Sequence, residues 1–205
     1  MYEDSYDAGN EIDRVIYQYY RENGGYFLGN PYAGQYPHCQ LILDMDSAPV
    51  SVLPVVTSQS QYGYGITCAA MTQAELKYPY HLEIVPMTFF KKGVELIAKA
   101  DIKVRYRDLD SKYLIKSDEP AFTQLILPGS RLADLLLQTK AFRIKVEPVA
   151  RERSLHAVQV FRNRSLGVEI QGKTINFEEL SAMIEICRET AVAVKSFAMP
   201  EKEER

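Results

Sequence analysis

Short segments in which apolar and polar residues alternate recur along this chain, and turn residues separate them. They fall at Cys39–Leu43, Val50–Val56, Ile66–Ala70, Tyr80–Val85, Tyr113–Lys116, Phe142–Glu147, Leu155–Phe161 and Leu166–Gln171. A side-chain period of two places the apolar residues on one face of a strand. Short strands joined by turns favour an antiparallel sheet, and no strand–helix–strand repeat points to a parallel one.

Helical periodicity appears at the two ends of the chain and once in the middle. Residues 10–23 carry an apolar stripe after a possible cap at Asn10, and Gly24-Gly25 ends that helix. Residues 120–127 and 130–139 predict a helical pair, because Pro128-Gly129 separates them and Ser130 can cap the second helix. We therefore expect an α+β fold, a mostly antiparallel sheet with an N-terminal helix, a helical pair in the middle and a long C-terminal helix.

The predicted C-terminal helix follows a cap at Asn176 and has a long apolar stripe. The stripe consists of Phe177, Leu180, Ile184, Cys187, Ala191 and Val194. The spacing of three and four residues is also that of a helix that pairs with a second chain. We favour the alternative in which the stripe packs into the core of its own domain.

The formal net charge of −3 hides two halves of opposite charge. Residues 1–86 hold 3 Lys/Arg against 10 Asp/Glu, and residues 87–174 hold 17 against 10. Twelve of the 14 tyrosines lie in the first 80 residues. The pattern predicts an acidic, Tyr-rich helix and β-meander half at 1–86 and a basic β/α half with the C-terminal helix at 87–205. No Gly/Ser-rich linker marks the join, so one continuous domain is the alternative.

A basic stretch in the second half is the strongest binding signal. Lys103, Arg105 and Arg107 alternate with three apolar residues, Ile102, Val104 and Tyr106. This alternation predicts a strand with one basic face, which could meet the phosphates of a nucleic acid or of an anionic lipid. The other explanation is that acidic groups of the first half neutralise this face. The isoelectric point near 5.7 argues against a dedicated nucleic-acid binder.

The tyrosines of the first half offer a second candidate surface. Tyr32, Tyr36, Tyr62 and Tyr64 lie in or beside predicted loops. Tyrosine is enriched in protein interfaces, because its ring is large and its hydroxyl is polar. The alternative is that these rings are half-buried at sheet edges.

Catalytic and metal-binding patterns are weak. A hydrophobic run ends in Asp44-Met45-Asp46, which is similar to the first motif of haloacid-dehalogenase-type phosphatases, but the chain continues in a β pattern where that chemistry needs a helix. The acidic residues at 108, 110, 118 and 119 fit turns and helix starts. The three cysteines and three histidines lack zinc-site spacing. We expect no catalytic residue, metal or cofactor.

Two stretches resemble uncharacterised prokaryotic domains of unknown function. They are Tyr26–Leu43 and Tyr113–Phe122, the latter with the Leu132–Leu137 helix and the Phe142–Val146 strand behind it, together about a third of the chain. The resemblance implies no catalytic residue and no ligand.

These observations favour a non-catalytic module that binds an unknown protein partner or a small ligand. The alternatives are a hydrolase or phosphoryl-transfer enzyme that uses an acidic pair, and a binder of phosphate-rich surfaces through a basic sheet face. No apolar run approaches the roughly 20 residues that a bilayer span needs. The acidic first dozen residues do not suit a signal peptide, so we expect a cytoplasmic protein.

Overall fold

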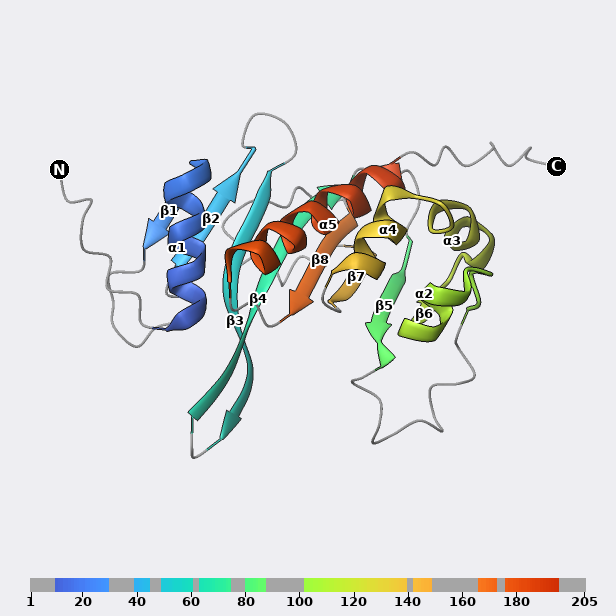
Figure 1. The fold of residues 1–205 in the computed structure, drawn as a ribbon, viewed down its shortest axis with the longest axis horizontal. Coiled ribbons are helices and arrows are strands. Elements are labelled where there is room, and N and C mark those ends of the chain that lie inside the picture. Colours follow the sequence, from blue (N-terminus) through green and yellow to red (C-terminus); the bar gives the residue numbers. More distant parts are fainter. Residues whose placement is uncertain are drawn as a thin grey trace.

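The computed structural model describes residues 10–29, 39–44, 49–60, 63–74, 80–87, 102–139, 142–148, 166–172 and 176–195. They form one antiparallel sheet and five helices, an α+β fold (Figure 1). The strands are β1 (Tyr26–Gly29), β2 (Cys39–Leu43), β3 (Val50–Ser60), β4 (Gly63–Ala74), β5 (Leu82–Pro86), β6 (Tyr113–Ser117), β7 (Arg143–Pro148) and β8 (Leu166–Gly172). The helices are α1 (Glu11–Asn23), α2 (Arg107–Lys112), α3 (Pro120–Ile126), α4 (Arg131–Gln138) and α5 (Phe177–Lys195).

The sheet has eight strands in the order β1-β2-β3-β4-β8-β7-β5-β6. This order interleaves the two compositional halves, because β5 from the acidic half lies between β7 and β6 of the basic half. The register aligns one row of residues across all eight strands, and all but Phe27, which is partly buried, are buried. The row runs Phe27, Leu41, Val52, Ala70, Ile170, Ile144, Ile84 and Ile115. It forms the centre of the hydrophobic core.

The helices α1, α4 and α5 cover one face of the sheet (Figure 1). Along α5, Ile184, Cys187 and Val194 are fully buried, so the apolar stripe packs against its own sheet. This confirms the intramolecular alternative for the predicted C-terminal helix. None of the helices in the described ranges is long and apolar enough to cross a membrane.

The predicted helix caps are confirmed by hydrogen bonds. The side chain of Asn10 accepts from the backbone N–H of Asp13 at 3.0 Å, and Ser130 accepts from that of Ala133 at 3.1 Å. α1 ends at Gly24, whose φ of +76° lies in the left-handed region that a glycine adopts without steric cost. These caps fix the ends of α1 and α4 as the sequence predicts.

Two parts of the sheet differ from the predicted pattern. The strands β3 and β4 run on past Val56 and Ile66 into a long hairpin that projects beyond the rest of the sheet (Figure 1). β1 forms at Tyr26–Gly29, where the sequence pattern predicts no strand. The predicted strand at 155–161 lies outside the described residues.

The predicted basic strand at 102–107 is wrong. Residues 102–106 are not part of the sheet, and Arg107 is the first residue of α2. The backbone turns at Arg105, whose φ of +61° is incompatible with a strand. The backbone N–H of Val104 binds a side chain, Asp110 Oδ1 at 3.0 Å, where a strand would use a neighbouring carbonyl. Burial still alternates as predicted, because Val104 is buried while Lys103 and Arg105 are exposed.

Candidate functional site

The segment 102–106 is fixed to the domain at three points. The N–H of Ile102 donates to the carbonyl of Ile115 in the edge strand β6 at 2.7 Å. Gln124 of α3 donates from Nε2 to the carbonyl of Lys103 at 2.9 Å. Together with the bond from Val104 to Asp110, these contacts hold the backbone directly before Arg105. The exposed basic side chains therefore project from an anchored segment.

Lys103, Arg105 and Arg107 line one hollow with Asp110 and Ser111. We call these five residues the basic hollow. It is a shallow, open depression of about 440 Å³ at the surface, which can take a charged group of a small molecule or of a larger partner. The structure thus brings together three of the predicted binding residues, although they do not share a strand face. Asp110 and Ser111 were not predicted as site residues, because the sequence pattern indicates Asp110 only as an acidic residue of a turn or helix start.

The two arginines of the basic hollow have no acidic partner among the described residues. Asp110 lines the same hollow, yet its carboxylate forms no ion pair with either guanidinium. The hypothesis that acidic groups within the chain neutralise this stretch is therefore not met at Arg105 or Arg107 in the described part of the chain. Their positive charge is available to an anion from outside.

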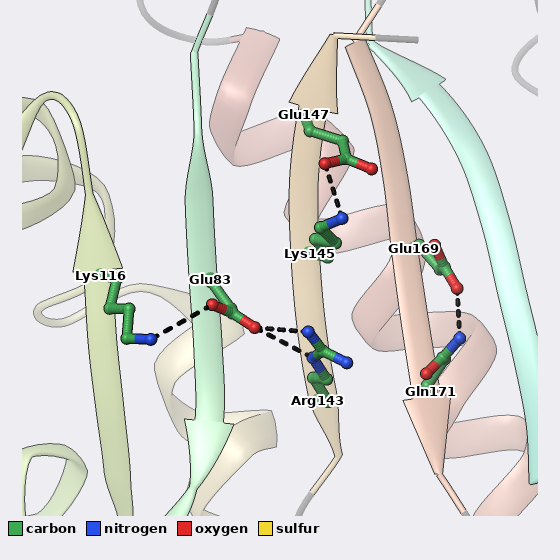
Figure 2. Close-up of polar contacts among 7 residues, drawn as sticks. All are labelled: Glu83, Lys116, Arg143, Lys145, Glu147, Glu169 and Gln171. Carbon is green, nitrogen blue, oxygen red and sulfur yellow. Dashed lines mark hydrogen bonds and ion pairs between the residues drawn. The ribbon is translucent and has the colours of Figure 1, made fainter. Parts of the chain in front are cut away.

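The basic residues of the sheet, unlike the two arginines of the basic hollow, have acidic partners. On the face opposite the helices, Glu83 of β5 lies between Arg143 of β7 and Lys116 of β6 (Figure 2). The guanidinium of Arg143 donates to Glu83 Oε1 from Nη2 at 2.6 Å and from Nε at 3.1 Å, and Lys116 Nζ lies 3.7 Å from Oε2. Here a carboxylate of the acidic half does neutralise cations of the basic half.

The same sheet face holds two further polar pairs. Lys145 Nζ lies 2.6 Å from Glu147 Oε2 on the same strand, and Gln171 donates to Glu169 (Figure 2). With Glu83 and its partners they cover β5 to β8 with matched groups. This face therefore offers an incoming anion little unbalanced charge.

The predicted tyrosine surface is not described. Tyr32, Tyr36 and Tyr62 lie outside the described residues. Tyr64 is in β4, where its backbone pairs with Gln59 of β3, and its side chain is not described. The proposal that these tyrosines contact a protein partner stays untested.

The acidic residues considered for catalysis make structural contacts. Asp44 has a φ of +54° and pairs with Arg188 of α5, whose Nε and Nη2 lie 2.9 and 2.5 Å from Oδ2. The strand before it, β2, is antiparallel to both neighbours, whereas the phosphatase motif needs a parallel strand. Asp118 accepts the backbone N–H of His81 at 2.9 Å. Asp46 lies outside the described residues.

The three cysteines are buried and free of disulfides. The thiol of Cys39 donates to the buried carboxylate of Asp13 at 3.4 Å. Burial raises the pKa of the Cys187 thiol, so it stays protonated at neutral pH. Within the described ranges no three His, Cys, Asp or Glu side chains lie together as a metal site would require. His38 is outside these ranges.

A second hollow, of about 300 Å³, lies between α3, α4 and the end of α5. Leu125 and Val192 line it and are 67% and 59% exposed. Arg131 at its rim pairs with Glu185 and Glu189 of α5, so the charges there are matched. This hollow lacks the unbalanced charge of the basic hollow.

Comparisons of the chain with protein-family models, with curated proteins and with solved structures gave no significant match. The resemblance to uncharacterised prokaryotic domains therefore stays a hypothesis, and the functional argument rests on the chain's own geometry.

Proposed function

We propose that this protein is a non-catalytic module that binds an anionic group of a small ligand or partner in the basic hollow. One observation carries the proposal. Arg105 and Arg107 line the same hollow as Lys103, and neither arginine has an acidic partner among the described residues.

The chemistry of these side chains supports an anionic ligand. A guanidinium presents a planar fork of donors that matches the oxygens of a phosphate or carboxylate, and it stays charged at every physiological pH. Like charges that share a hollow repel each other, and a bound anion removes that repulsion. The anchored backbone directly before Arg105 lowers the entropy cost of binding.

The alternatives have less support. The acidic residues that phosphoryl transfer would use at Asp44 and Asp118 are engaged by Arg188 and by the backbone of His81. A flat phosphate-rich surface would meet the sheet face of β5 to β8, where Glu83 and Glu147 neutralise the basic groups. In the basic hollow, by contrast, basic side chains outnumber acidic ones.

Calorimetric titration with inorganic pyrophosphate in low salt tests the proposal. The double variant Arg105→Gln/Arg107→Gln should lose at least about tenfold in affinity, because each charge-assisted hydrogen bond contributes about 1.5–3 kcal/mol. The matched control is Arg14→Gln/Lys195→Gln, which removes the same charge from exposed positions on α1 and α5. The control should retain wild-type affinity. Absence of binding by the wild type, or an equal loss in both variants, would overturn the proposal.

A further inference from the structure

Four charged residues on the sheet face opposite the helices form a row whose charges alternate in sign (Figure 2). The register aligns Lys116 of β6 with Glu83 of β5, and Glu83 with Lys145 of β7. Lys145 is aligned in turn with Glu169 of β8. We call these four residues the charged row. From β6 to β8 its charges are positive, negative, positive and negative, over about 14 Å, because neighbouring strands lie about 4.8 Å apart.

The two ends of the charged row have no close ionic partner among the described residues. Lys116 Nζ lies 3.7 Å from Glu83 Oε2, which is beyond hydrogen-bond distance. Glu169 accepts from the amide of Gln171 and forms no ion pair with a described residue. The row also remains accessible, because the side chains of Lys116, Lys145 and Glu83 are 33%, 29% and 26% exposed.

The order of the charges makes the row complementary to itself. A two-fold axis parallel to the strands, between β5 and β7, places a second copy face to face with the first and reverses the order of its row. Glu83 then faces Lys145 of the second copy, and Lys116 faces its Glu169, so that all four positions join opposite charges. A two-fold axis across the strands keeps the order and sets every charge against its like. The pattern therefore favours one orientation and disfavours the other.

We propose that two copies of this chain associate through the charged row about the axis parallel to the strands, a property separate from anion binding in the basic hollow. Sheets that pack face to face lie about 10 Å apart, a distance that Lys and Glu side chains from the two copies span together. A carboxylate accepts about four hydrogen bonds and an ammonium donates three, so Glu83 and Lys145 can keep their present partners. A contact only four strands wide is small and polar, so the dimer is weak and sensitive to salt.

Sedimentation velocity of the full chain, from about 10 μM to about 1 mM, measures the association, and low salt favours it because exposed charges are then screened least. We expect a reversible monomer–dimer equilibrium in this range. Raising the salt from about 50 mM to about 500 mM should increase the dimer Kd by about tenfold or more, because the contact joins partly exposed charges. A wild type that stays monomeric throughout this range would overturn the proposal.

A charge swap at the two ends of the row tests the orientation. Glu169→Lys and Lys116→Glu, made singly, each set like charges against each other between the copies, and each should raise the dimer Kd by about tenfold or more. The double variant restores opposite charges between the copies and should dimerise within about threefold of the wild type. Within one chain the double change has the reverse effect, because the register places each new charge beside a like charge, that of Lys145 or of Glu83.

The matched control is Glu22→Lys, which makes the same change of charge at an exposed position on α1, a helix on the other side of the sheet (Figure 1). It should dimerise as the wild type does, and circular dichroism should show that every variant keeps its fold. Recovery in the double variant alone supports the contact between copies. A double variant that dimerises no better than the single ones, single variants that dimerise like the wild type, or an equal loss in Glu22→Lys would each overturn the proposal.

Discussion

Replacing Arg105 with glycine should make the protein more stable and weaken its anion binding. Arg105 has a φ of +61°, in the left-handed region where the β-carbon of an L-residue crowds the backbone. Its guanidinium forms no ion pair with the described residues, so removing it loses no such contact. Stability and function should thus respond in opposite directions.

Two opposing terms set the size of the stability gain. The left-handed conformation costs an L-residue about 1–2 kcal/mol, and glycine removes this cost. Glycine also gives the unfolded chain more freedom, which offsets about 0.5–1 kcal/mol. The expected net gain is about 0.5–1 kcal/mol, which corresponds to a rise in Tm of about 1–4 °C for a chain of this size.

Urea denaturation followed by circular dichroism measures the gain, and calorimetry with pyrophosphate measures binding. Arg105→Gln is the matched control, because it removes the charge but keeps the β-carbon. It should have wild-type stability and the same loss of binding as Arg105→Gly. A glycine variant that is less stable than the glutamine variant would refute the reasoning that Arg105 is held in a strained conformation.

Three further substitutions test the packing that supports the site. Ile184→Asp should unfold the monomer, because it places an unpaired charge at a fully buried position; a folded monomer by circular dichroism and light scattering would contradict the burial of α5. Lys112→Met should lower the free energy of unfolding by about 1.5–3 kcal/mol in urea, because Lys112 Nζ donates to three carbonyls at the end of α4, that of Leu136 at 2.6 Å; unchanged stability would show that these bonds add nothing. Gly172→Ala should cost about 1–3 kcal/mol in the same assay, since the added Cβ would lie 2.3 Å from Cδ1 of the buried Phe142; a neutral result would mean that the ring can move aside.

Many strands and helix starts could be predicted, because the sequence pattern of each segment agrees with the way that segment packs in the domain. The period of two at Phe142–Glu147 predicts a strand, and the register confirms it by aligning Ile144 with Ile84 and Ile170 in the core. The caps at Asn10 and Ser130 are set by hydrogen bonds between neighbours in the sequence, so a short pattern suffices to find them.

The strand order could not be predicted, because it depends on contacts between distant segments. β4 pairs with β8, which lies about a hundred residues later in the sequence. Nothing in the sequence of either segment identifies the other as its partner. The segment β1 was missed because Tyr26–Gly29 has only four residues and follows two glycines, and its strand conformation comes from pairing with β2.

The three basic residues of the basic hollow could be named from the sequence, but its other lining residues and its geometry could not. The alternation around Val104 correctly indicates which side chains are buried. The alternation cannot show that the Asp110 side chain accepts a hydrogen bond from the backbone N–H of Val104, or that the chain turns at Arg105. That turn replaces a flat basic strand with a hollow, and it adds Asp110 and Ser111 to the lining.

The most direct test of the basic hollow is an NMR titration of the ¹⁵N-labelled protein with inorganic pyrophosphate. The side-chain Nε–H signals of Arg105 and Arg107 report on the guanidinium groups, and the backbone amides of 102–111 report on the segment that carries them. The account predicts saturable shifts in these signals and no comparable shift at Leu125 or Val192 in the second hollow. Shifts centred elsewhere, or no saturable shift in these signals, would contradict the assignment of anion binding to the basic hollow.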